Sequence, residues 1–261
     1  MTLFNFFFKH FLYVLPIFVT KKIIKLSKIF FLETNFKKLP VNNHPLNNLI
    51  KIKDKYNNIR PFISYTHLPD LLAVYIQERK KLVFYDYGAG NLDLYFYLKK
   101  KLNKFIYFFH DQEILNKYIK AIKIKKKLKN LKINNFSKIK KIDFAYFGSS
   151  IQYLEDYQKK IKPFFKKSKY IIISASPFFE NYKYKQSQKN IVMKQLNLFP
   201  IINYLYGINY IDFTNFMKKN NYSLLEKNIN RVSKNVNFKN FKNKFKTVDM
   251  LDLIFVYNKK I

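Results

Sequence analysis

The sequence predicts an α/β protein with a mostly parallel β-sheet that is covered by helices on both faces. Short apolar runs alternate along the chain with segments of helical periodicity, which is the pattern of strand–helix–strand units. Several of these runs end in polar residues or glycine. The clearest case is Leu82–Tyr87, which contains Asp86 and is followed by Gly88 and Gly90. The chain has only four glycines, so this pair indicates a turn that needs a positive φ or close approach to bare backbone.

The strands are predicted where apolar residues run without a helical period. The first follows Leu68–Arg79, which fits an amphipathic helix with Pro69 and Asp70 in its favoured first turn. We expect seven strands, at Leu82–Tyr87, Phe105–Phe109, Leu131–Ile133, Ile142–Phe147, Tyr170–Ser174, Tyr222–Glu226 and Leu251–Tyr257.

The segments between these strands carry apolar residues at helical spacing. In a parallel sheet each crossover returns the chain to the same edge, and a helix usually makes that connection. We expect helices at Leu92–Leu102, Gln152–Phe165 and Phe213–Asn220, and one helix or a pair of short helices at about 112–129.

Polar residues that suit ligand binding follow three of the predicted strands. Carboxyl ends of parallel strands meet at one edge of the sheet, where ligands commonly bind. Asp86, Gly88 and Gly90 mark the first such end, and Asp111 marks the second, about twenty residues on, where a carboxylate often holds ribose hydroxyls. Ser149 and Ser150 follow a third strand.

Simpler interpretations of these residues remain open at this point. The glycine pair lacks the third glycine of a dinucleotide fingerprint, because Asp93 stands in its place. An ordinary tight turn and a helix N-cap at Asp111 therefore compete with a ligand site.

The first 62 residues form a predicted N-terminal extension and connector, and residues 63–261 form the main domain. Residues 3–32 are apolar and aromatic but include lysines, and they fall short of the roughly 20 apolar residues of a membrane span. Residues 33–62, rich in Asn, Lys and Pro, predict a connector. Residues 3–32 fit a helix packed on the domain, an interfacial segment on a membrane surface, or a weak membrane anchor.

The charge of the chain is strongly positive, with 50 Lys and Arg against 16 Asp and Glu. Only three of the basic residues are Arg, the better residue for bidentate phosphate and base contacts. Lys, Asn, Ile, Phe and Tyr are all residues of AT-rich codons, so we attribute the charge to composition and expect no specific nucleic-acid binding. The chain has no Cys, and its four His are far apart, so we expect no metal site.

The order of several short motifs resembles a bacterial family of S-adenosylmethionine-dependent methyltransferases that is often linked to surface-polysaccharide gene clusters. The motifs are Y-D-Y-G-A-G-N at 85–91, F-F-H-D-Q at 108–112, G-S-S-I-Q-Y-L-E-D-Y at 148–157 and Y-I-I-I-S-A-S-P at 170–177. The resemblance covers about residues 60–230. It implies a Rossmann-like class I methyltransferase sheet with the last strand reversed, and S-adenosylmethionine as cofactor.

The resemblance also implies roles for individual residues. Asp86, Gly88 and Gly90 match the first cofactor motif, and Asp111 matches the acid that binds the ribose, although a Glu is expected there. Its other implied cofactor-binding residues are Gln112, Ser149 and Gln152.

The function that follows is methyl transfer to a small, glycan or lipid-linked acceptor. The general base is unknown; His110 and Glu155 are candidates by position only. A catalytically inactive binding or membrane-associated module and a nucleic-acid methyltransferase are the alternatives, the latter disfavoured because G-S-S-I-Q replaces an N-P-P-Y motif. We expect a cytoplasmic protein, with peripheral contact to the inner membrane face through residues 3–32.

Overall fold

The structure, a computed structural model, describes residues 15–28, 31–33, 72, 81–133, 136–181, 190–196, 203–230 and 245–258. The predicted helix Leu68–Arg79 lies outside this part of the chain except for Leu72, which is helical and buried.

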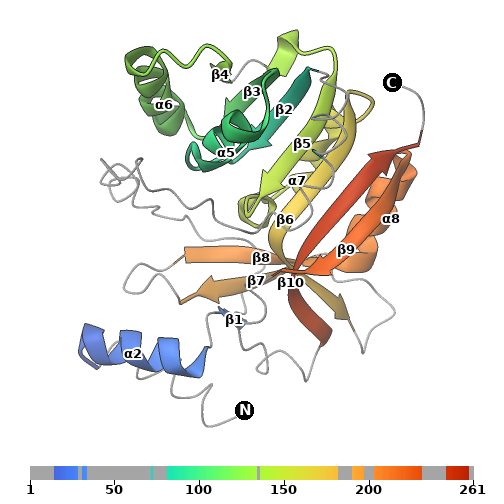
Figure 1. Ribbon diagram of the computed structural model, residues 1–261. Helices are drawn as coiled ribbons and strands as arrows, with labels where there is room; N and C mark the ends of the chain where they lie inside the picture. The colour runs from blue at the N-terminus through green and yellow to red at the C-terminus, as the bar shows by residue number, and fades with distance from the viewer. Residues whose placement is uncertain are drawn as a thin grey trace.

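A seven-stranded core sheet has the order β4-β3-β2-β5-β6-β10-β9 (Figure 1). β2 to β6 run parallel, whereas β10 runs antiparallel to both β6 and β9. This order confirms the mostly parallel, Rossmann-like sheet with a reversed last strand. The strands are β2 (Leu82–Tyr87), β3 (Phe105–His110), β4 (Leu131–Ile133), β5 (Ile142–Gly148), β6 (Ser168–Asn181), β9 (Tyr222–Ile229) and β10 (Phe245–Tyr257).

Helices cover both faces of this sheet, as predicted. Alternate strand residues point to opposite faces: Phe84 packs in one apolar cluster and its neighbour Tyr85 in another. The Phe84 cluster includes side chains of α5 (Asp93–Lys101) and α6 (Glu113–Lys125). The Tyr85 cluster includes those of α7 (Tyr157–Ile161) and α8 (Tyr210–Lys219), so the core has two apolar layers separated by the sheet.

An accessory sheet extends the core sheet beyond its carboxyl edge. β6 and β10 are longer than predicted. The first part of β6 pairs with β5, and its continuation pairs at Phe178 and Phe179 with β8 (Asn203–Asn209). β7 (Asn190–Gln195) pairs antiparallel with β8, and β1 (Phe31–Glu33) with β7. The sequence prediction missed these three strands because their apolar runs are short and have no helix crossover to mark them.

The change of neighbour along β6 occurs at an irregular step that a buried carboxylate stabilises. Ala175 has a φ of 48°, and the β6–β10 register shifts between Leu251 and Leu253. Asp252, in that shift, accepts hydrogen bonds from the Ser174 hydroxyl at 2.7 Å and the Ala175 amide at 2.9 Å. The Asn230 amide nitrogen donates to both carboxylate oxygens at 2.8 Å. The carboxylate thus holds β6 and β10 in their bent course.

The predicted helix Gln152–Phe165 is wrong as a single helix. The segment forms η2 (Ile151–Tyr153), α7 and η3 (Lys162–Phe164). Leu154 is extended and ends η2, and the Asp156 side chain accepts from the Lys159 amide at 3.1 Å to begin α7. The cap at Asp156 therefore decides where the helix begins, although the apolar residues before it also have helical spacing.

The N-terminal extension contributes α2 (Ile17–Ser27), in agreement with the expected helical extension. Thr20 and Ile24 are its buried residues. Within the residues described, no helix combines the length and apolar character that crossing a membrane requires.

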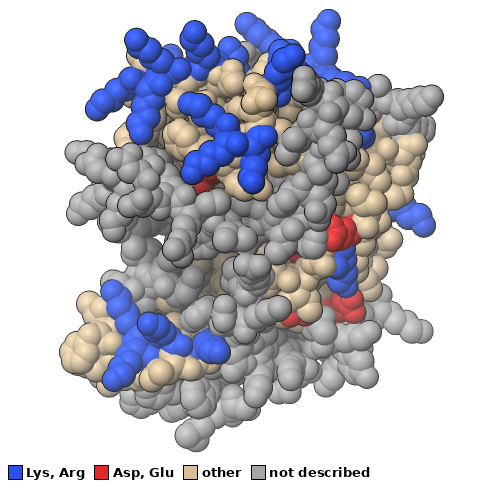
Figure 2. Space-filling view, viewed as in Figure 1, with Lys and Arg blue, Asp and Glu red and all other residues tan. Residues whose placement is uncertain are grey.

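Many of the lysines in the described part of the chain gather at the amino edge of the core sheet, and a second group lies on α2 (Figure 2), although along the sequence they look dispersed. Figure 2 shows the first group over the end of the molecule that carries α5 and α6. No acidic residue occurs in 94–105, 122–131, 136–142 or 162–170, the segments that precede β3 to β6. Cations at the C-terminal ends of α5 and α6 also interact favourably with the helix dipoles. These helix-end lysines are Lys99, Lys100, Lys101, Lys123 and Lys125.

Replacing Asp252 with Ala should destabilise the protein by about 3 kcal/mol, because the buried donors of Ser174, Ala175 and Asn230 lose their acceptor. Urea unfolding followed by circular dichroism measures this change. Asp249→Ala, in the same strand but half-buried, is the control, with an expected loss below about 1 kcal/mol. Equal losses in the two variants would contradict the role of the Asp252 carboxylate.

Candidate functional site

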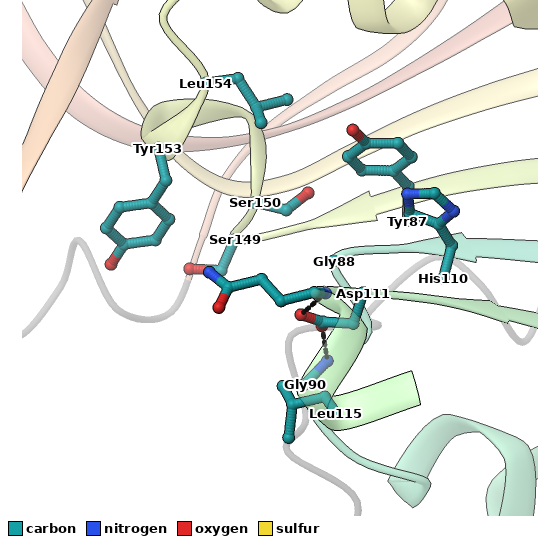
Figure 3. A pocket seen from close by; sticks show the side chains of 11 residues that line it. Tyr87, Gly88, Gly90, His110, Asp111, Leu115, Ser149, Ser150, Tyr153 and Leu154 are labelled. Carbon is teal, nitrogen blue, oxygen red and sulfur yellow. Dashed lines mark hydrogen bonds between the residues drawn. The ribbon is translucent and has the colours of Figure 1, made fainter. Parts of the chain in front are cut away.

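A cavity of about 390 Å³ opens at the carboxyl edge of the core sheet (Figure 3). It lies at the ends of β2, β3 and β5. β2 lies between the other two strands: the chain first continues to β3 on one side of β2 and later returns to β5 on its other side. Such switch points of parallel sheets are where ligands bind. Its lining residues are Tyr87, Gly88, Gly90, His110, Asp111, Gln112, Leu115, Ser149, Ser150, Tyr153 and Leu154.

The glycine turn forms one wall of the cavity and is attached to the end of β3. Gly88 and Gly90 have φ angles of 69° and 64°, in the left-handed region that glycine adopts readily. The amides of Gly88 and Ala89 donate to the His110 carbonyl at 2.8 and 3.2 Å. A Cβ on Gly88 would lie 2.5 Å from the Ser150 Cβ, so only glycine lets the two segments approach this closely.

Asp111 joins the glycine turn to the start of α6. One carboxylate oxygen accepts from the Gly90 amide and the other from the Gln112 amide, both at 2.7 Å. The Asn116 side chain fixes the backbone of Asp111: its oxygen accepts from the Asp111 amide at 3.1 Å and its nitrogen donates to the Asp111 carbonyl at 2.6 Å. Each carboxylate oxygen keeps a lone pair for a further donor.

Two aromatic rings line the cavity beside the glycine turn. The Tyr87 and His110 rings stack with centroids 4.5 Å apart and planes at 19°. The Tyr85 hydroxyl lies 3.1 Å from His110 Nδ1. Burial, and then the charge of Tyr87, raise the pKa of Tyr85, so its phenol stays protonated.

The contact between Tyr85 and His110 links the phenol to the imidazole tautomer. Tyr85 is 1% exposed, and among the described residues His110 Nδ1 is the acceptor within reach of its hydroxyl. When the Tyr85 hydroxyl donates to Nδ1, the neutral ring carries its proton on Nε2; in the other tautomer Nδ1–H donates to the phenol oxygen. In either tautomer, Nδ1 is engaged with the Tyr85 hydroxyl and the contact holds the ring in place.

Another wall of the cavity is formed by the segment that follows β5, and a buried glutamine supports it. Ser149 has a φ of 51°, and its amide donates to the Ser174 carbonyl at 2.7 Å. Gln152, 1% exposed, donates to the Ser149 hydroxyl at 2.8 Å and accepts from the Ser176 hydroxyl at 3.0 Å. Gln152 therefore lies behind the cavity wall and supports it.

Asp86 also lies behind the wall rather than in the lining. It is 3% exposed, and the Tyr107 hydroxyl donates to its carboxylate. Burial raises the pKa of Asp86 to about 7; the Tyr107 hydrogen bond opposes this rise, and the charge of Asp111 adds to it. This carboxyl therefore titrates near neutral pH.

Tyr153 connects the cavity to the accessory sheet. Its hydroxyl donates to Gln195 of β7 at 3.1 Å, and its ring packs against the apolar cluster of the accessory sheet. Burial raises the pKa of Tyr153 to about 12, while the Gln195 hydrogen bond lowers it. The phenol is neutral at physiological pH and donates to the glutamine.

The structure brings most of the predicted site residues together. Of those named from the sequence, Asp86 and Gln152 lie behind the wall, and Glu155 is exposed in the turn between η2 and α7, outside the lining. Gly88, Gly90, His110, Asp111, Gln112 and Ser149 line the cavity.

Five lining residues were not singled out as site residues. Ser150 was noted only as following its strand, although it adjoins Ser149 in the same motif, and this adjacency is a signal that could have identified it. The others lie in helical or aromatic patterns typical of core residues. These are Tyr87, Leu115, Tyr153 and Leu154. Among the described residues, no group of three or more His, Cys, Asp or Glu could hold a metal ion.

Comparisons with known proteins give structural neighbours only. The sequence matches no family model and no curated protein. A 1,6-didemethyltoxoflavin-N1-methyltransferase from Burkholderia thailandensis, solved with S-adenosylhomocysteine, is 8% identical over 88% of this chain and 95% of that one, with a TM-score of 0.49. An S-adenosylmethionine-dependent methyltransferase from Clostridium acetobutylicum is 13% identical over 83% and 97%, with a TM-score of 0.47. At these values, function has to be argued from the site itself.

The free energy of unfolding should fall as the pH rises from about 4 to 7. In the unfolded chain the Asp86 carboxyl releases its proton near its ordinary pKa of 3.8, whereas the folded protein keeps it until about 7. This difference corresponds to a loss of about 4 kcal/mol as an order of magnitude. Urea unfolding at several pH values, compared with Asp86→Asn, isolates the effect, because the variant keeps an acceptor for Tyr107 but cannot ionise. Identical pH profiles for the two proteins would contradict it.

Proposed function

We propose that this protein is an S-adenosylmethionine-dependent methyltransferase. The observation that carries the proposal is the junction of Asp111 with the Gly88–Gly90 turn at the switch point of the sheet. A carboxylate beside a bare-backbone turn can hold hydroxyl groups of a nucleoside while the rest of the ligand lies against the turn. The resemblance of the sequence motifs supports the same ligand.

The lining fits the chemical groups of this cofactor. The Asp111 carboxylate has acceptor capacity for ribose hydroxyls, and Gly90, beside which a Cβ would meet nothing within 4 Å, leaves room for a polar chain along the turn. Leu115, Leu154 and the Tyr153 ring provide apolar surface for an adenine ring. When bound, the cofactor supplies an electrophilic methyl group on a positively charged sulfur. The face of an aromatic ring, such as Tyr87, stabilises positive charge of this kind.

The residues of the site contribute mainly by orientation. Methyl transfer is an in-line displacement, so holding the reactants aligned in a site that excludes water supplies much of the rate. The raised pKa values of Tyr85 and Tyr87, caused mainly by burial, keep both phenols neutral. We assign His110 an orienting role in the Tyr85–His110–Tyr87 stack rather than the role of general base. The proposed acceptor is a small molecule, a glycan or a lipid-linked sugar.

Isothermal titration with S-adenosylhomocysteine tests the proposal. The wild-type protein should bind it, and Asp111→Asn should weaken binding about tenfold or more, because one amide oxygen cannot replace both carboxylate oxygens. Asp156→Asn is the control: it changes an exposed helix-capping carboxylate outside the lining, and its affinity should equal that of the wild type. Absence of binding to the wild-type protein would refute the proposal.

We further propose that residues 3–32 attach the enzyme to the cytoplasmic face of a membrane, where a lipid-linked acceptor would be found. α2 presents apolar and basic side chains together: Phe18 and Leu26 are each 73% exposed, and Lys21, Lys22 and Lys25 are exposed on the same helix. Apolar residues can enter the interface while lysines contact anionic headgroups, each lysine contributing about 1 kcal/mol.

Vesicle flotation tests this attachment. The full chain should float with vesicles of phosphatidylcholine and phosphatidylglycerol, and Phe18→Glu combined with Leu26→Glu should leave most of it unbound. Ile124→Glu is the matched control, because Ile124 is 69% exposed among lysines but lies at the end of α6. A wild-type protein that stays unbound, or a loss of flotation with Ile124→Glu alone, would contradict the proposal.

A further inference from the structure

The amino edge of the core sheet is the part of the molecule that the proposed function leaves unused. Four segments lead into β3, β4, β5 and β6 at this edge, and together they contain sixteen lysines and no acidic residue. Fourteen of these lysines are exposed and two are half-buried. We call the surface that they form the lysine face. Its segments are 94–105, 122–131, 136–142 and 162–170.

The parallel sheet brings these segments together. β3 to β6 run in the same direction, so their amino ends share one edge, and the segment before each strand returns the chain to that edge. Figure 2 shows lysines over this end of the molecule, whereas the cavity opens at the carboxyl edge. A partner bound at the lysine face therefore leaves the cavity accessible.

Composition explains why lysine is abundant but not why it occupies two turns of this face. Lys127 and Lys166 have φ angles of 50° and 64°, in the left-handed region that Gly and Asn adopt more readily than Lys. Asn is as typical of AT-rich codons as Lys is, and the turn after α8 does use it, at Asn221 with a φ of 65°. Lysine at these two turns therefore indicates a use for the charge.

The helix dipoles account for only part of the lysine face. A cation at a helix C-terminus stabilises the helix, but this effect is confined to the last turn. Lys104, Lys129 and Lys140 lie in loops beyond those turns. Like charges this numerous repel one another in the free protein, and an anionic partner removes the repulsion.

The make-up of the lysine face indicates which anion it suits. The described residues include no Arg, so the face offers charge without bidentate base contacts. Ile124 is the only large apolar side chain that these fully described segments expose, so the face lacks the apolar groups that Phe18 and Leu26 of α2 offer to lipid. A protein partner would also need an apolar centre. Phosphate groups in water fit this surface better than either.

The aromatic rings of the lysine face are covered by lysines. Lys167 Nζ lies 4.6 Å from the centre of the Phe136 ring, and Lys169 Nζ lies 5.1 Å from that of the Tyr170 ring. A ring face in such a contact is not open for stacking on an unpaired base. The lysine face therefore suits a phosphate backbone rather than unstacked bases.

The width of the lysine face fits a short run of phosphates. Its segments span five adjacent strands, in the order β4-β3-β2-β5-β6. Neighbouring strands lie about 4.8 Å apart, so the face is about 19 Å wide. One strand of a nucleic acid carries a phosphate about every 3.4 Å of helix axis. About five phosphates can therefore lie over the face.

We propose that the lysine face binds the phosphate backbone of a nucleic-acid duplex without sequence preference. The contact is a tether: the cavity lies at the opposite edge of the sheet, so the nucleic acid is not the methyl acceptor. The tether does not depend on the identity of the cofactor. It also agrees with the expectation that the chain binds no specific nucleic-acid sequence, because phosphate contacts carry no sequence information.

Fluorescence anisotropy with labelled duplexes of about 20 base pairs tests the tether. Two DNA duplexes of unrelated sequence should bind the full chain with Kd values within about twofold of each other. The logarithm of the binding constant should fall with the logarithm of the salt concentration with a slope of about −4.5, as five neutralised phosphates predict. An RNA duplex of the same length shows which of the two backbones binds more tightly.

Two sets of substitutions locate the contact. Lys104→Gln, Lys129→Gln and Lys140→Gln, combined, should reduce the magnitude of the slope by about 2.7, since each lysine neutralises one phosphate. Lys127→Asn combined with Lys166→Asn should reduce it by about 1.8. Asn suits the left-handed turns better than Lys, so this second variant should unfold at the wild-type midpoint or above it. Its weaker binding is then not a loss of fold.

A matched control removes the same charge from the other end of the molecule. Lys21→Gln, Lys22→Gln and Lys25→Gln in α2, combined, should leave the slope unchanged. An equal decrease in this control would show attraction by net charge alone and would overturn the proposal, as would unchanged binding in both lysine-face variants. A wild-type protein that binds no duplex at about 50 mM salt would overturn it as well. If those variants then also lose flotation with anionic vesicles, the face binds lipid instead.

Discussion

The buried carboxylate of Asp252 is the interaction on which the arrangement of the two sheets depends. Its oxygens accept from β6 at Ser174 and Ala175, and from Asn230 after β9. At this point β6 exchanges β5 for β8 as its neighbour. Because the Ser174 carbonyl also accepts from the Ser149 amide, the same step supports the cavity wall that follows β5. Fold and site therefore share this polar centre.

The backbone of two segments fixes the shape of the cavity. The Gly88 and Ala89 amides donate to the end of β3, and the Gly90 amide donates to Asp111, so the glycine turn cannot move independently of its neighbour. Positive φ angles at Gly88, Gly90 and Ser149 occur at the two segments that enclose the space. A rigid wall of this kind keeps ligand-binding groups oriented before a ligand arrives, which lowers the entropic cost of binding.

The sequence predicts the core sheet well because local pattern and global fold agree there. Strands such as Leu82–Tyr87 and the glycine turn after it follow from apolar runs and from scarce glycines placed where the backbone needs them. The accessory sheet was not predicted, because the antiparallel pairing of β7 and β8 leaves no local pattern in the sequence. The positions of Asp86 and Gln152 behind the cavity wall could not be predicted for a related reason. A strand-end carboxylate looks the same in sequence whether it faces a cavity or a core tyrosine such as Tyr107.

β6 and β10 continue through both sheets, and this continuity affects how parts of the molecule unfold locally. A strand that belongs to two sheets cannot leave one without disturbing the other, so both should protect their amides from hydrogen exchange as one cooperative unit. The Tyr153–Gln195 hydrogen bond extends that unit to β7. A ligand that immobilises Tyr153 should therefore slow the local unfolding of β7, a strand outside the cavity lining.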